Sequence, residues 1–145
     1  MNLLMSKIIN SLAYQIESTG AQITVDQLLP CRGDEVQVSQ VFTNLLDNAI
    51  KYRAAERRLE VHISSAVAGD AAQYCIRDNG IGIHPDYQSQ VWEIFHRINP
   101  RDIPGEGLGL TVSRRILDRL NGTIWLESEE GVGSSFCITL PVQRT

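Results

Sequence analysis

The hydrophobic and polar positions of this chain follow two periods, which predict helices and strands in a definite order. Apolar residues recur at helical spacing over Leu3–Ser18 and Gln37–Ala55, and we expect one helix in each range. Gly20 is expected to end the first helix, and Asp34 to cap the second. The apolar stripe of the second, longer helix consists of Val38, Val41, Phe42, Leu45, Leu46, Ala49 and Tyr52.

Short runs rich in apolar residues predict the strands. The expected strands are Gln22–Val25, Glu60–Ala66, Ala72–Arg77, Thr123–Ser128 and Ser134–Leu140. A further helix is expected after His84-Pro85-Asp86, and another from Leu110 to a C-cap at Gly122. Between them, residues 99–104 carry two prolines and no periodicity, so we expect a loop there.

Composition restricts the class of protein. A chain of 145 residues predicts one domain that needs neither a metal nor a disulfide to stabilise its core. The net charge of −4 and the lack of a basic face argue against nucleic acid as a partner. No apolar run is long enough to span a bilayer, and no export signal is evident, so we expect no membrane contact. Cys31, Cys75 and Cys137 lie far apart without metal-ligand spacing, and we interpret them as buried thiols in a reducing compartment.

The segment Arg77–Ile83 combines a carboxylate with two glycines. Asp78 ends a strand-like run, and Gly80 and Gly82 follow two residues apart. An aspartate at this position can accept a hydrogen bond from an exocyclic amine such as that of adenine, and the glycines let a ligand approach the backbone. An Asp-Asn-Gly sequence is also an ordinary turn, so both interpretations stay open at this point.

In two other segments, polar residues or glycines recur at spacings that would suit a metal or phosphate site. Asn44, Asn48 and Lys51 share one face of the long helix, which is either a solvated face or a set of groups for a divalent metal and phosphates. The sequence 105–110 places glycines at alternate positions before a helix. Such a loop either presents backbone N–H groups to an anion or serves as a flexible connector.

Taken together, these segments resemble the catalytic and ATP-binding domain of bacterial sensor histidine kinases. This domain belongs to a superfamily shared with the gyrase B subunit, the mismatch-repair ATPase and the heat-shock chaperone ATPase. The resemblance covers nearly the whole chain, and residues 51–53 and 123–128 are most similar to phytochrome-type and PAS-linked kinases. The similar boxes, in order, are Asn44–Tyr52, Asp78–Ile83, Val91–Arg97 and Gly105–Leu110, with the ending Gly131–Phe136.

The resemblance implies an α+β fold, a two-layer α/β sandwich of the Bergerat type with a mixed sheet packed on helices. It also implies ATP and Mg²⁺ as ligands, and residues 1–145 as a single ATP-binding catalytic domain. Residues 1–20 are similar to the segment that joins this domain to a dimerisation and phosphoacceptor hairpin, which we expect on a separate part of the parent kinase.

Carried over by resemblance, Asp78 would accept a hydrogen bond from the adenine amine, and Gly80 and Gly82 would admit the base. Tyr52 would line the base pocket. The remaining positions expected in the ATP site are Ile83, Phe95, Gly105, Gly107, Leu108, Gly109, Leu110 and Ser135.

The same resemblance assigns the groups near the transferred phosphate. Asn48 would ligate Mg²⁺, and Asn44 would assist at the metal or the phosphates. Lys51 would contact phosphate, and Arg97 would contact phosphate or stabilise the transition state. For Arg101, a solvated loop charge is the better interpretation.

One position bears on the reaction. ATP-hydrolysing relatives carry a water-activating glutamate one turn before the metal-binding asparagine, and here that position is Asn44, which favours transfer to a protein over hydrolysis. His62, His84 and His96 each lie outside a phosphoacceptor pattern. We therefore expect transfer of the γ-phosphate to a histidine on a separate hairpin, no autophosphorylation in cis, a response regulator receiver domain downstream, and a cytoplasmic location.

Two alternatives remain at this stage. Glu106 lies between the lid glycines, where a carboxylate would repel phosphate, point to solvent or bind a cation. It supports a degenerate nucleotide-binding or docking module that regulates a partner. An anti-sigma-type serine kinase shares the boxes, although the ending of this chain is more similar to sensor kinases.

Overall fold

The computed structural model describes residues 1–87 and 106–142. Its helices are α1 (Asn2–Ser11), α2 (Ala13–Thr19), α3 (Glu35–Lys51), α4 (Glu106–Arg119) and the short 3₁₀ helix η1 (Pro85–Tyr87). Its strands are β1 (Gln22–Val25), β2 (Glu60–Ala68), β3 (Ala71–Asp78), β4 (Thr123–Glu129) and β5 (Gly133–Pro141). Within these two ranges, no helix combines the length and apolar character that crossing a membrane requires.

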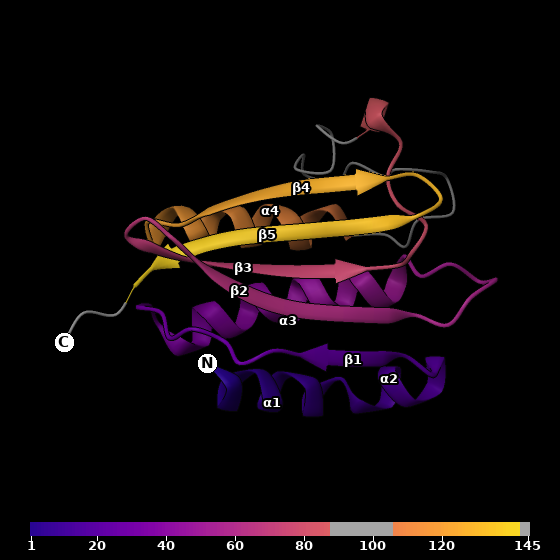
Figure 1. The fold of residues 1–145 in the computed structure, drawn as a ribbon, viewed down its shortest axis with the longest axis horizontal. Helices are drawn as coiled ribbons and strands as arrows, with labels where there is room; N and C mark the ends of the chain where they lie inside the picture. Colours follow the sequence, from indigo (N-terminus) through magenta and orange to yellow (C-terminus); the bar gives the residue numbers. More distant parts are fainter. Residues whose placement is uncertain (88–105, 143–145) are drawn as a thin grey trace.

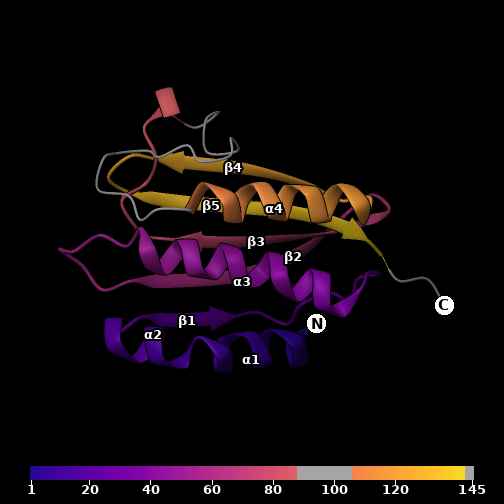
Figure 2. The same ribbon diagram turned by 180° about the vertical axis from the view of Figure 1, so that it is seen from behind.

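The described strands form one mixed sheet in the order β1-β2-β3-β5-β4. β1 and β2 are parallel, and the other neighbouring strands are antiparallel. Helices α3 and α4 cover one face of the sheet, and α1 and α2 lie beside β1 and contact α3 (Figures 1 and 2). The expected sandwich of a mixed sheet on helices is therefore confirmed.

The core lies between the sheet and the helices. The expected stripe of α3 is buried from Val38 to Ala49, and Tyr52 at its end is half-buried. Each Val, Leu or Phe side chain of the stripe contributes roughly 1.5–3 kcal/mol when fully buried. Phe42 packs edge-to-face on Tyr74 of β3, with ring centroids 5.6 Å apart. Tyr74 and Ile76 face the helices, so the alternate residues Cys75 and Arg77 lie on the opposite face of the sheet.

The expected helices differ from the observed ones at their ends. The first is broken at Leu12, which keeps its buried side chain while its backbone leaves helical geometry. α3 ends at Lys51 rather than at Ala55, because the Tyr52 carbonyl accepts a hydrogen bond from the Ile81 N–H at 3.0 Å instead of continuing the helix. The expected caps at Gly20 and Asp34 are confirmed, the latter by a 3.0 Å bond from the Gln37 N–H to its carboxylate.

The last helix begins and ends differently from its prediction. α4 begins at Glu106, so Gly107 and Gly109 lie in its first turn rather than in a preceding loop. At its other end Asn121, not Gly122, takes the left-handed conformation, with φ 60°. Gly122 is required for a different reason, since a Cβ there would overlap the Thr139 carbonyl oxygen of β5.

The interpretation of the cysteines as free thiols is wrong for two of the three. Cys75 and Cys137 pair directly across β3 and β5, with their Cα atoms 4.1 Å apart, and form a disulfide. The two cysteines are 62 positions apart in the sequence, and their contact depends on strand register, which local patterns do not give. Cys31 is free, and burial raises the pKa of its thiol.

Candidate functional site

Asp78 occupies the last position of β3, where the sheet meets the loop of residues 79–84. Its Oδ1 accepts hydrogen bonds from the N–H groups of Gly80, at 2.9 Å, and Ser134, at 3.3 Å. Burial raises the pKa of the carboxyl group above its usual range, and these two hydrogen bonds act in the opposite direction. Both N–H groups point to the same oxygen, so the carboxylate presents Oδ2 as an acceptor for a ligand.

The glycines beside Asp78 allow close packing of three segments. A Cβ on Gly80 would overlap the Tyr52 carbonyl oxygen at the end of α3. Gly82 has a φ of +71°, and a Cβ there would overlap the Glu129 carbonyl oxygen. The loop after β3 is thus held between α3 and the turn that joins β4 to β5. The atoms that a Cβ would overlap here belong to the protein's own main chain, and the role of the glycines in admitting the base stays a prediction.

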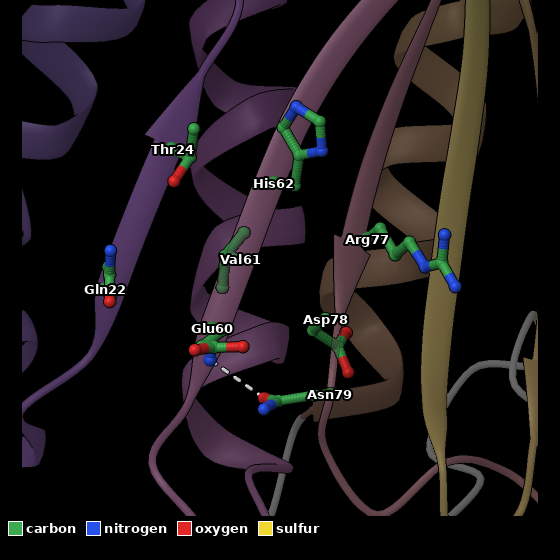
Figure 3. A pocket seen from close by; sticks show the side chains of 8 residues that line it. All are labelled: Gln22, Thr24, Glu60, Val61, His62, Arg77, Asp78 and Asn79. Atoms are coloured by element: carbon green, nitrogen blue, oxygen red, sulfur yellow. Dashed lines mark hydrogen bonds between the residues drawn. The ribbon is translucent and has the colours of Figure 1, made fainter.

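Asn79 fixes the start of this loop. Its Oδ1 accepts a hydrogen bond from the Glu60 N–H at 2.8 Å (Figure 3). Its Nδ2 donates to the Arg58 carbonyl at 3.0 Å. Asp78 and Asn79 also border a hollow of about 420 Å³, on the face of the sheet away from the helices. The hollow is lined by Gln22, Thr24, Glu60, Val61, His62, Arg77, Asp78 and Asn79.

Asn44 joins the two long helices. Its Nδ2 donates to Ser113 Oγ of α4 at 3.1 Å, and its Oδ1 accepts from Gln40 at 2.9 Å. Ser113 is fully buried, so this bond lies inside the interface between α3 and α4. The pairing holds Asn44 as a neutral amide one turn from Asn48.

Asn48 is the candidate metal ligand. It is buried, and its Nδ2 has no hydrogen-bond partner among the described residues. An unpaired buried N–H donor costs roughly 1–3 kcal/mol, which an acceptor such as a phosphate oxygen would offset, whereas Oδ1 is the Asn48 atom that could ligate a metal. In residues 1–87 and 106–142 no group of three or more His, Cys, Asp or Glu side chains forms a metal cage. Asn44 and Asn48 offer neutral amides, which suit Mg²⁺ that takes most of its ligands from ATP phosphates and water.

Lys51 and Tyr52 lie at the end of α3 toward the loop. The Lys51 ammonium forms an ion pair with Asp47 at 2.8 Å, one helical turn away. Tyr52 is half-buried, and its carbonyl anchors Ile81. The structure therefore brings both residues to the edge of the site, with Lys51 engaged in a pair that the sequence did not indicate.

Ser135 borders a hollow together with Asp78 but does not pair with it. It lies opposite Arg77 in the register of β3 and β5, on the face of the sheet that the helices leave open. Its neighbour Ser134 lies opposite Asp78, is buried, and donates its N–H to the carboxylate. The serine that bonds to the Asp78 carboxylate is thus Ser134, and the assignment of Ser135 to the ATP site stays a prediction.

The remaining predicted residues divide into three groups. Ile83 and Leu110 are buried, and the Ile83 N–H donates to Ser128 Oγ at 2.8 Å. Gly107, Leu108 and Gly109 belong to the first turn of α4, whose leading N–H groups have no partner within the helix. Phe95, His96, Arg97, Arg101 and Gly105 lie outside the described residues.

Comparison with known proteins identifies the family. Residues 33–144 match the model of the family described as histidine kinase-, DNA gyrase B-, and HSP90-like ATPase. Cyanobacterial phytochrome A of Nostoc sp. is 38% identical over 139 residues, which are 95% of this chain and 18% of the relative. The sensor protein kinase WalK of Staphylococcus epidermidis is 35% identical over 147 residues, covering 98% of this chain and 24% of the relative.

Solved structures agree on the fold. The catalytic domain of the histidine kinase ThkA, in a nucleotide-free form, matches with a TM-score of 0.80 at 23% identity and covers 97% of this chain and 92% of its own. Full-length ShkA in complex with AMPPNP matches with a TM-score of 0.81 at 25% identity, covering 98% of this chain and 30% of its own. This chain spans less than a quarter of the length of both curated relatives. It belongs to the family of histidine kinase-, DNA gyrase B- and HSP90-like ATPases, and its relatives include sensor histidine kinases.

Proposed function

We propose that this chain binds Mg-ATP and transfers the γ-phosphate to a histidine on a helical hairpin elsewhere in its parent kinase. The observation that carries the proposal is the Asp78 carboxylate, with Oδ1 fixed by two N–H groups and Oδ2 available to a ligand. Oδ2 would accept a hydrogen bond from the adenine amine. Membership of the family and the relation to sensor kinases support the same function.

The nucleotide would lie between α3, the loop after Asp78 and the first turn of α4. Asn48 and Asn44 would hold Mg²⁺ and the phosphates, and the leading N–H groups of α4 would face the phosphate chain. Bound Mg²⁺ would neutralise charge on the β- and γ-phosphates. Lys51 would add a cation if it exchanges Asp47 for phosphate, and Arg97 is proposed as a further phosphate or transition-state contact.

The hydrogen bonds of Asn44 favour transfer over hydrolysis. A general base must accept a proton from the attacking group, and a neutral amide does not do so at ordinary pH. Asn44 is a neutral amide that forms hydrogen bonds with Gln40 and Ser113. Water therefore lacks an activating group at this position, and an external histidine would be the nucleophile.

The proposed partners follow from this chemistry. The phosphoacceptor hairpin would dock near the γ-phosphate, and a response regulator receiver domain would take the phosphate from it. We propose a cytoplasmic location, where ATP and such receivers are present. Disulfides are uncommon in reducing compartments, so the redox state of Cys75 and Cys137 bears on this location.

A transfer assay tests the proposal. The chain is incubated with Mg-ATP labelled at the γ-phosphate and a hairpin, carrying the acceptor histidine, from a related sensor kinase. We expect acid-labile, alkali-stable label on the hairpin, none on this chain alone, and none on a hairpin with His→Ala. Acid-stable label on a serine-bearing partner would favour the serine-kinase alternative, and ATP binding without any transfer would favour a docking module.

A further inference from the structure

We propose that Arg57 is a positioning residue of the nucleotide site, which holds the loop after Asp78 in the shape that the adenine pocket requires. Arg57 lies in the connection between α3 and β2. The inference deepens the proposed function and rests on it, because it presumes that adenine binds at Asp78.

The Arg57 guanidinium donates to main-chain carbonyl groups of two separate turns. Nε donates to the Asn79 carbonyl at 2.6 Å, and Nη2 donates to the Gly80 carbonyl at 2.7 Å. Nη2 also contacts the carbonyls of Gly131, at 3.1 Å, and Val132, at 3.2 Å, in the turn between β4 and β5. One planar cation thus bridges the loop after β3 and the turn that supports it.

These contacts connect Arg57 to the Asp78 carboxylate through one residue. The carbonyl of Gly80 accepts from Arg57, and the N–H of Gly80 donates to Asp78 Oδ1. The Gly80 N–H shares its peptide unit with the Asn79 carbonyl, which accepts the 2.6 Å bond from Arg57 Nε, so rotation of that unit would misdirect the N–H and release the carboxylate. Arg57 therefore fixes the orientation of the Asp78 carboxylate, the proposed acceptor. Its own N–H groups donate to the carbonyl groups of the loop.

The geometry differs from that of a solvated surface arginine. The Arg57 side chain is 32% exposed, whereas the carboxylate of Glu56, its ion-pair partner at 3.2 Å, is 72% exposed. An exposed pair of this kind contributes little. The hydrogen bonds from the charged guanidinium to four carbonyl groups are stronger than this ion pair. A lysine ammonium cannot reproduce their planar arrangement.

The adjacent arginine offers a matched control. The Arg58 side chain donates from Nε to the Gly20 carbonyl at 2.7 Å, at the end of α2. Only its main-chain carbonyl touches the loop, as the acceptor for Asn79 Nδ2. Arg58→Met removes the same charge from the next position and leaves that carbonyl in place.

The test measures ATP and ADP binding by calorimetry for the wild-type chain, Arg57→Met, Arg57→Lys and Arg58→Met. Arg57→Met is expected to weaken both nucleotides by about ten-fold, equivalent to ~1.4 kcal/mol, with an unchanged ATP-to-ADP ratio because the base pocket is affected. The affinity of Arg57→Lys for both nucleotides is expected to lie between the affinities of Arg57→Met and the wild-type chain. Arg58→Met should stay within about two-fold of wild type, since its side chain leaves the loop untouched.

A double-mutant cycle separates positioning from general destabilisation. If Arg57 acts through the carboxylate, the loss caused by Arg57→Met shrinks in an Asp78→Asn background. The same factor in both backgrounds overturns the inference, as does wild-type affinity in Arg57→Met or an equal loss in Arg58→Met. Thermal unfolding establishes that each variant is folded. If Arg57→Met does not fold, the double-mutant cycle is measured with Arg57→Lys in its place. Absence of nucleotide binding in the folded wild-type chain overturns the proposed function together with this inference.

Discussion

Asp78→Asn should reverse the hydrogen-bonding character of the proposed adenine site. The N–H groups of Gly80 and Ser134 both point to Oδ1, so the amide oxygen of the variant must occupy that position to accept them. The amide NH₂ then takes the place of Oδ2. It faces the exocyclic amine of adenine, and two donors oppose each other.

The size of the effect follows from the bond that is lost. A hydrogen bond to a charged group contributes about 1.5–3 kcal/mol, so the dissociation constant for ATP should rise roughly 10- to 150-fold. Inosine triphosphate carries a carbonyl oxygen where adenine carries the amine. The variant should therefore lose its preference for ATP over inosine triphosphate, because its NH₂ group can donate to that oxygen.

Calorimetric titration with both nucleotides measures these constants. Asp26→Asn is the control, since it makes the same change of charge at a half-exposed side chain that pairs with His62 on β2, away from the proposed pocket. Unchanged ATP affinity in Asp78→Asn, or an undiminished preference for ATP over inosine triphosphate, would refute the assignment of Oδ2 to the adenine amine.

The same variant should not weaken the fold at neutral pH. Because burial raises the folded-state pKa of Asp78, its stabilising contribution is fully present when the group is protonated at low pH, and it is lost as pH rises through the raised pKa. Asn stays neutral, so the unfolding free energy of the variant should rise relative to wild type over that range. Urea unfolding at a series of pH values checks this sign, and a relative fall would contradict it.

Three further predictions concern other parts of the site and the sheet. Asn48→Ala should abolish Mg²⁺-dependent phosphotransfer to an added hairpin, and retained transfer would remove Asn48 from the metal site. Gly82→Ala should destabilise the fold by about 1–3 kcal/mol in urea unfolding, because φ is +71° and a Cβ would overlap the Glu129 carbonyl; Gly69→Ala shares the positive φ but has open space around it and should cost less. Denatured protein kept from reductant should show one titratable thiol, Cys31, and three thiols before reduction would contradict the bridge. Reduction of the Cys75–Cys137 bridge, whose cysteines are 62 positions apart, should lower the free energy of unfolding by about 2–4 kcal/mol.

The sequence pattern predicted helices and strands well where residues close in sequence determine them. β1 was expected at Gln22–Val25 and lies there, and Asp34 caps α3 as its side chain allows. Ends that depend on tertiary contacts could not be predicted in this way. Tyr52 leaves α3 because its carbonyl meets Ile81, a residue 29 positions later whose position only the fold determines.

The acidic and glycine positions assigned to the site from the sequence stay predictions, and the residues that support them in the structure had no signal that was used. Arg57 stands in the run Glu56-Arg57-Arg58, which is typical of a solvated surface, and nothing local shows that its neighbours in space are carbonyl groups. The alternation of inward and outward positions along β5 indicates which of the two serines faces the helices. Ser134 shares its face with the buried Phe136, so a shift of one residue to Ser135 moves the hydroxyl to the other side of the sheet.

The most direct test of the central claim is a titration of the wild-type chain with ATP and ADP, with and without Mg²⁺, by calorimetry. The account predicts saturable binding of one nucleotide per chain and an affinity for ATP that depends on Mg²⁺. A folded chain that binds neither nucleotide at millimolar concentration would contradict it, and would leave Asp78 and its glycines as elements of the fold alone.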